Sequence, residues 1–121
     1  MGKLDGKVAI ITGAGGGIGQ AAARLFAAEG AKLMLVDINE EPLLALAKSI
    51  GADQTVYTVA DVSSVSDVQT YLKSTIEQFG RIDVTLLNAG IEGRIASISN
   101  QTEEDFDRVM AINTRGVWLG L

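Results

Sequence analysis

Residues 8–19 read VAIITGAGGGIG, and this stretch decides the fold. The apolar, β-branched run up to Thr12 is typical of a buried strand, and the pattern that begins at Ile18 is typical of a helix. Glycines stand between them, where a sharp turn needs positive φ angles and a ligand needs close access to the backbone. The N–H groups at a helix start lack helical partners and lie at the positive end of the helix dipole. The stretch therefore predicts a strand, a turn that can hold a pyrophosphate, and a helix.

The glycine spacing fits one dinucleotide-binding pattern better than another. The strict pattern G-x-G-x-x-G is missed by one place, because Ile18 stands in its last position when the count begins at Gly13. The looser spacing Thr-Gly-x-x-x-Gly-x-Gly is met in full. A plain flexible turn would also be rich in glycine, so the prediction of a dinucleotide-binding turn depends on the flanking strand and helix patterns. The predicted cofactor-binding residues of this turn are Thr12, Gly13, Gly15, Gly16, Gly17, Ile18 and Gly19.

A carboxylate follows the next predicted strand, residues 32–36. Asp37 stands where an acidic residue accepts hydrogen bonds from the adenosine ribose hydroxyls of a dinucleotide. It would repel a 2′-phosphate, and Ile38 beside it offers no positive charge to pair with one, so NAD is favoured over NADP. A different interpretation stays open, in which Asp37 only ends the strand or caps the next helix, a task that Asn39 could also perform.

The remaining patterns alternate between strand and helix. Strands are predicted at 7–11, 32–36, 54–59 and 82–87, and the helices between them at 17–29, 40–50 and 65–79. Asn39 is predicted to cap the second helix, and Ser64 with Asp67 to form a capping box for the third, whose buried face would carry Val65, Val68, Leu72, Ile76 and Phe79. The alternation predicts an α/β fold of the Rossmann type, a doubly wound parallel sheet of order 3-2-1-4 in three α/β/α layers. We expect residues 1–121 to form a single domain.

Composition excludes several classes of function. The net charge of −5, with no basic run, argues against binding to nucleic acid or to an anionic membrane. The sequence holds neither cysteine nor histidine, which excludes disulfides, thiol nucleophiles, His-based triads and imidazole–metal sites, and no metal site is expected. No apolar run is long enough to span a membrane, and no signal-peptide pattern is seen, so a cytoplasmic location is expected.

Taken together, the motifs resemble the cofactor-binding, N-terminal portion of the short-chain dehydrogenase/reductase family, over all 121 residues. The resemblance rests on the glycine turn, Asp37, Asp61-Val62, Asn88-Ala89-Gly90 and the run VMAINT at 109–114. It implies that Asp61 and Val62 contact the adenine, and that Asn88, Ala89 and Gly90 flank the nicotinamide half while stabilising the sheet. It also implies that Asn113 supports a proton-relay water beside the catalytic lysine. Leu87 is a departure, since the family often has a second asparagine there.

The catalytic half of the family pattern is missing. That chemistry needs a serine and a tyrosine whose pKa is lowered by a lysine four residues later. Tyr57 and Tyr71 are the only tyrosines, and Asp61 and Thr75 stand four residues after them. We therefore expect the cofactor-binding half of a longer NAD-dependent oxidoreductase, with an alcohol or carbonyl substrate and a tendency to form homo-oligomers through an open sheet edge.

Two alternatives remain open on the sequence alone. A non-catalytic NAD-binding module would account for the missing tyrosine and lysine. An S-adenosylmethionine-dependent methyltransferase would also combine a glycine-rich turn with an acidic second strand end, although such enzymes usually place a carboxylate where this chain has Thr12.

Overall fold

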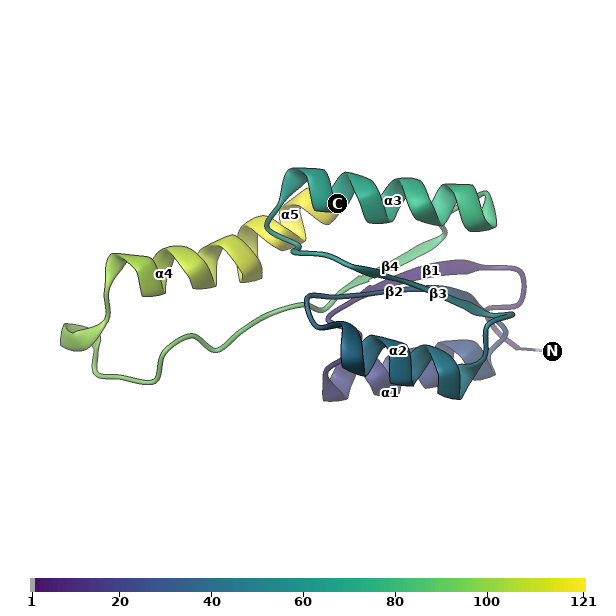
Figure 1. Ribbon diagram of the computed structural model, residues 1–121, viewed down its shortest axis with the longest axis horizontal. Helices are drawn as coiled ribbons and strands as arrows, with labels where there is room; N and C mark the ends of the chain where they lie inside the picture. The colour runs from purple at the N-terminus through teal and green to yellow at the C-terminus, as the bar shows by residue number, and fades with distance from the viewer. Residues whose placement is uncertain (1) are drawn as a thin grey trace.

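The computed structural model describes residues 2–121, which form a four-stranded parallel sheet between two layers of helices (Figure 1). The strand order β3-β2-β1-β4 confirms the predicted order. Each strand lies within a residue or two of its predicted position. The strands are β1 (Val8–Thr12), β2 (Lys32–Asp37), β3 (Thr55–Val59) and β4 (Val84–Leu87).

The helices cover the two faces of the sheet unequally. The pair α1 (Gly17–Ala28) and α2 (Glu40–Ile50) lies on one face, and α3 (Val65–Phe79) lies on the other with the short α5 (Gly116–Gly120) (Figure 1). Helix α4 (Glu103–Met110) projects beyond the sheet, after a long loop that contains the 3₁₀ turn Ile98–Asn100. It runs into α5 through a π-helical turn, Ala111–Arg115. Within residues 2–121, no helix combines the length and the apolar character needed to cross a membrane.

The two central strands are buried on both faces, which explains their continuous apolar sequence. Alternate side chains of β1 and β2 point to opposite sides, so Ile11 and Leu35 join the core under α1 and α2, while Ile10 and Met34 join the core under α3. All four are fully buried. Burial of each such side chain contributes about 1.5–3 kcal/mol, so this double core holds the carboxyl ends of the strands in fixed positions.

The buried face of α3 differs from the predicted one. Val68 is buried as expected, but Val65 and Ile76 are 45% and 48% exposed, and the buried positions are instead Tyr71 and Thr75. The Thr75 hydroxyl donates a hydrogen bond of 2.6 Å to the carbonyl oxygen of Tyr71, one turn earlier. Because that bond satisfies the hydroxyl inside the helix, threonine can face the core here, which hydrophobicity alone does not predict.

The predicted caps are confirmed only in part. Ser64 caps α3, since its Oγ accepts a hydrogen bond of 3.3 Å from the amide of Asp67. The second half of the predicted capping box is wrong, because the Asp67 carboxylate accepts from the amide of Asp61 instead. Asn39 stands at the N-cap of α2 but makes no side-chain cap bond, so that prediction is also wrong. Its backbone amide donates to the Asp37 carboxylate at 3.2 Å.

A carboxylate also joins the starts of the two neighbouring strands β1 and β4. Asp83 Oδ2 accepts a hydrogen bond of 2.9 Å from the amide of Val8, and Asp83 Oδ1 accepts one of 2.6 Å from Arg81. The hydrogen bond from Arg81, and then the one from Val8, hold the pKa of Asp83 below its ordinary value. The charged carboxylate is therefore favoured in the folded state.

This pKa shift predicts a loss of stability in acid. A carboxyl group whose pKa is lower in the folded state contributes stability above its unfolded pKa and loses it as the pH falls through the folded pKa. We expect the free energy of unfolding, measured with urea, to fall between about pH 5 and about pH 3. The fall should be smaller in Asp83→Asn, where this group does not titrate. An equal fall in the variant would contradict the role given to Asp83.

A second prediction concerns Tyr71, which is 1% exposed and whose hydroxyl has no hydrogen-bond partner within residues 2–121. Burial also raises the pKa of this hydroxyl. Since an unpaired buried hydroxyl costs free energy, Tyr71→Phe should leave the protein as stable or stabilise it by up to about 1 kcal/mol in urea unfolding. Destabilisation by more than about 1 kcal/mol would show that the hydroxyl has a partner in solution.

Candidate cofactor-binding site

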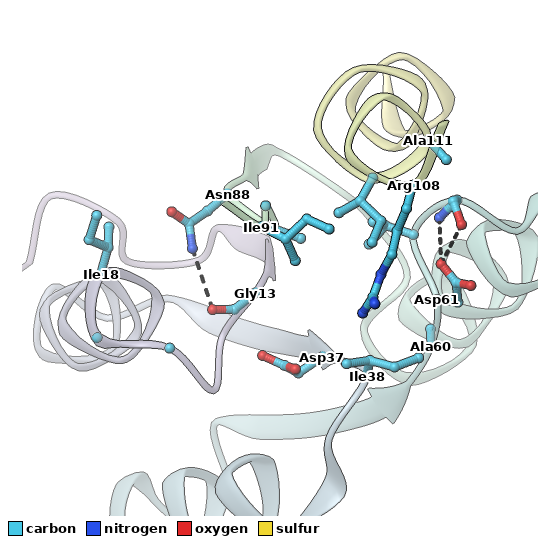
Figure 2. A pocket seen from close by; sticks show the side chains of 17 residues that line it. Gly13, Ile18, Asp37, Ile38, Ala60, Asp61, Asn88, Ile91, Arg108 and Ala111 are labelled. Atoms are coloured by element: carbon cyan, nitrogen blue, oxygen red, sulfur yellow. Dashed lines mark hydrogen bonds between the residues drawn. The ribbon is translucent and has the colours of Figure 1, made fainter. Parts of the chain in front are cut away.

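A cleft of about 560 Å³ opens at the carboxyl ends of the strands, between the glycine turn and helix α4 (Figure 2). This volume is in the range of small-molecule sites, and the place is where parallel sheets bind ligands. Most predicted site residues line it: Gly13, Gly16, Gly17, Ile18, Asp37, Ile38, Asp61, Val62, Asn88, Ala89 and Gly90. The others, Thr12, Gly15, Gly19 and Asn113, lie beside or beneath it. Six lining residues were not predicted: Ala60, Ser63, Ile91, Arg108, Ala111 and Ile112.

The glycine turn packs directly against the loop that follows β4. Gly13 has a φ of +67°, and a Cβ there would lie 2.8 Å from the Cα of Ala89. The amide of Ala89 donates a hydrogen bond of 3.1 Å to the buried Thr12 hydroxyl. The Asn88 side-chain amide donates one of 3.4 Å to the carbonyl oxygen of Gly13, as Figure 2 shows. Thr12 therefore lies below the cleft and fixes the relative position of two of its walls.

Helix α1 begins at the cleft without a side-chain cap. Its N-cap residue is Gly16, and like α2 it has no side-chain cap bond, whereas α3 and α4 begin with hydrogen bonds to the side chains of Ser64 and Thr102. The first N–H groups of a helix have no partner inside it, so those of α1 are left for an anion. A Cβ built on Gly17 would meet no atom within 4 Å, so the helix start faces open space. This is a cradle that a side chain would fill.

Asp37 joins the end of β2 to the glycine turn. Its Oδ2 accepts a hydrogen bond of 2.9 Å from the amide of Gly15, and its Oδ1 accepts the one from Asn39. A carboxylate has about four acceptor positions, so each oxygen can still accept another bond. The two interpretations of Asp37 are thus compatible, since the residue that orders this corner also presents a carboxylate to the cleft (Figure 2).

The far end of the cleft is an apolar slot beside a second carboxylate. Ile38 leaves 58% of its surface exposed, while Val62 is only 7% exposed, and both line the cleft. Asp61 Oδ1 accepts hydrogen bonds from the amide and the hydroxyl of Ser63, at 2.9 and 2.6 Å. These bonds order the turn after β3. A flat, apolar ring with polar edges fits such a slot.

Asn113 lies outside the cleft lining, in the π-helical turn rather than in a regular α-helix. Its Oδ1 accepts a hydrogen bond of 2.8 Å from the amide of Ile91, and its Nδ2 donates one of 2.7 Å to the carbonyl oxygen of the same residue. The side chain thus holds the loop after β4 against the π-helical turn. Ile91 lines the cleft, so Asn113 acts on the site through its neighbour.

Among the residues that sequence reasoning missed, Arg108 and Ile112 carried only a partial signal, which places them on one helix face without indicating that this face lies toward the cleft. They are four positions apart on consecutive helical turns, and such residues share one face. Ile91 directly follows the Asn88-Ala89-Gly90 turn. Ala60 and Ser63 flank Asp61-Val62 in the sequence. Within residues 2–121, no group of three or more acidic, histidine or cysteine side chains could hold a metal ion.

Comparison with known proteins agrees with this geometry. The family model described as short chain dehydrogenase matches residues 7–121. Levodione reductase of Leifsonia aquatica is 46% identical over 123 residues, which cover 98% of this chain and 46% of that protein. A 3-ketoacyl-(acyl-carrier-protein) reductase from Brucella melitensis, solved in complex with NADH, has a TM-score of 0.93 at 38% identity, and the match covers 98% of this chain and 48% of that one.

A short chain dehydrogenase/reductase from Burkholderia phymatum, solved in complex with NAD, has a TM-score of 0.92 at 34% identity, over 99% of this chain and 43% of that one. The chain spans about half the length of the curated relatives that it matches. The family match extends over the whole site, from the glycine turn to the π-helical turn. The chain belongs to the short-chain dehydrogenase/reductase family.

Proposed function

We propose that this chain is the cofactor-binding half of an NAD-dependent oxidoreductase, which moves a hydride between NAD(H) and an alcohol or carbonyl substrate. One observation carries the proposal: the uncapped start of α1 and the Asp37 carboxylate line the same cleft, and a hydrogen bond of 2.9 Å from Gly15 to Asp37 joins them. A diphosphate and its neighbouring ribose need these two features side by side.

The residues present fit such a cofactor, which supplies the hydride acceptor when it is bound. The backbone amides at Gly16, Gly17 and Ile18 would hold the diphosphate, and the Asp37 carboxylate would accept bonds from the adenosine ribose. The slot beside Ile38, Asp61 and Val62 would take the adenine. Asn88, Ala89 and Gly90 would flank the nicotinamide half. The remaining predicted residues, Thr12, Gly13, Gly15 and Gly19, would hold the turn in shape.

NAD rather than NADP is the proposed cofactor because of charge. A 2′-phosphate on the ribose would stand against the Asp37 carboxylate, and like charges at short range repel. Ile38, which follows, is apolar and offers no compensating cation. The Brucella melitensis and Burkholderia phymatum structures hold NADH and NAD, which supports a nicotinamide cofactor for this chain.

For Asn113 we propose a positioning role in the reaction. Its two hydrogen bonds with Ile91 hold the loop that leads away from the nicotinamide end of the cleft. The relay water and the lysine that the family resemblance implies would belong to the whole protein, as would its substrate. Two relatives are named levodione reductase and borneol dehydrogenase, and such reductase and dehydrogenase activities support the alcohol or carbonyl substrate class proposed here.

We also propose that the protein forms homo-oligomers and works in the cytoplasm. Strand β4 is an edge of the sheet, and Phe106, Met110 and Trp118 expose 63%, 40% and 69% of their surfaces. Exposed apolar side chains of this size are typical of contact surfaces. The absence of cysteine from the sequence is compatible with a reducing compartment.

Calorimetric titration tests the cofactor proposal. The protein should bind NADH at least about tenfold more tightly than NADPH, and it should not bind S-adenosylmethionine. The family match gives no support to the methyltransferase alternative. Absence of NADH binding by the folded protein would overturn the proposed function. A protein that binds NADH but reduces no carbonyl compound in its full-length form would instead be a non-catalytic NAD-binding module.

A further inference from the structure

Arg108 is a cleft residue to which the proposed function gives no task. It lies on α4, and among residues 2–121 it is the only basic residue that lines the cleft, whose other charged residues in this range are Asp37 and Asp61. Figure 2 shows its side chain reaching from α4 into the cleft, with the guanidinium group above Ile38. The proposed function does not explain why a long cationic side chain extends into this cleft.

The guanidinium of Arg108 also differs from those of the other arginines. Hydrogen bonds join Arg24 to Ser49, Arg81 to Asp83, Arg94 to Asp105 and Arg115 to the carbonyl oxygen of Ser63. Arg108 has neither a side-chain hydrogen bond nor an ion pair within residues 2–121. Its five N–H donors are therefore available to a ligand, and its planar guanidinium is of the kind that stacks on aromatic rings.

The surface below the guanidinium is apolar. Ile38 lines the cleft and is 58% exposed, and the neighbouring Ala60 and Val62 are buried, with 3% and 7% exposure. An aromatic ring that lies on Ile38 would have its other face toward Arg108. Guanidinium groups stack on aromatic faces, and the attraction is stronger where water is excluded. The ring of NAD that belongs at this end, beside Asp37 and Asp61, is the adenine.

We propose that Arg108 binds the adenine ring of the cofactor, by closing over it from α4 and holding it against Ile38. This inference rests on the proposed function, because it assigns a further contact within the same cleft. The proposal also explains why a positive charge lies in this cleft. The dinucleotide brings two negative phosphate charges into a cleft whose other ionised groups are carboxylates, and one cation there makes the local potential less repulsive.

The experiment compares Arg108→Met with Lys73→Met in calorimetric titrations of the protein. Both variants remove one positive charge, but Lys73 lies on α3 with 80% of its side chain exposed and does not line the cleft. The probes are NADH, ADP-ribose, and reduced nicotinamide mononucleotide, which lacks the adenosine half. Arg108→Met should weaken NADH and ADP-ribose binding by about tenfold and leave the mononucleotide within about twofold of wild type. Lys73→Met should change none of the three by more than about twofold.

Arg108→Lys separates stacking from charge, because an ammonium group is a point charge without a planar face. This variant should still bind ADP-ribose at least about threefold more weakly than wild type. Full affinity in Arg108→Lys, unchanged ADP-ribose binding in Arg108→Met, or an equal loss for the mononucleotide would each overturn the assignment. These outcomes differ from failure of the proposed function, in which the wild-type protein itself does not bind NADH.

Discussion

Replacing Gly17 by alanine is expected to weaken NADH binding by about 100-fold or more while the protein stays folded. The residue is the first of α1, and a Cβ there meets no atom of the protein within 4 Å. Alanine favours a helix over glycine by up to about 1 kcal/mol, so thermal unfolding should occur at the same temperature or higher. The added methyl group would stand between the helix amides and a diphosphate, and these short contacts cannot form past it.

Gly19→Ala is the matched control, because the same methyl group is added two residues later. There a Cβ would overlap the carbonyl oxygen of Gly13 and lie 2.7 Å from the Cα of Ala14. The backbone must move to make room for this methyl group. We therefore expect Gly19→Ala to lower the free energy of unfolding by about 2–4 kcal/mol and to abolish NADH binding. If Gly17→Ala bound NADH as wild type does, the diphosphate could not rest on this helix start. If it unfolded as Gly19→Ala does, the open space at Gly17 would be contradicted.

The sequence was sufficient for the fold because the decisive signals are local. Buried parallel strands require continuous apolar runs, and Ala9 to Ile11 and Leu33 to Val36 supply them. The polar residues that end these strands must meet at one edge of the sheet, which is why most predicted site residues line one cleft. The order 3-2-1-4 is compatible with right-handed crossovers between the strands and is one of the common orders of doubly wound sheets.

The parts that could not be predicted depend on contacts between distant segments. The pairing of Asn113 with the backbone of Ile91 spans 22 positions and includes a loop without any periodic pattern. That loop also decides which side of α4 faces the cleft, so Arg108 could not be separated from the other charged residues of that helix. In α3, Thr75 is buried and Ile76 is exposed, which is the reverse of what hydrophobicity predicts. A hydrogen bond within the helix satisfies the threonine hydroxyl and allows this arrangement.

The second large effect is expected in Asp37→Ala, whose preference for NADH over NADPH should fall by about 100-fold. In the wild type, a carboxylate about 4 Å from a 2′-phosphate costs about 4 kcal/mol at an effective dielectric constant of about 20. Alanine removes that repulsion and also the bonds to the ribose hydroxyls, so NADPH should bind more tightly and NADH more weakly. Calorimetric titration of each cofactor measures both changes.

Asp37→Asn and Asp61→Asn separate the causes of that effect. Asparagine at 37 keeps an oxygen that can accept the bond of 2.9 Å from Gly15, so the turn stays ordered while the charge is lost. Its preference for NADH should therefore fall nearly as far as that of Asp37→Ala, with less loss of thermal stability. Asp61 also lines the cleft, but its Oδ1 is bound to Ser63 at the adenine end, so Asp61→Asn should leave the preference within about threefold of wild type. An equal fall in both variants would mean that the net charge of the cleft, and not the carboxylate at the ribose, selects the cofactor.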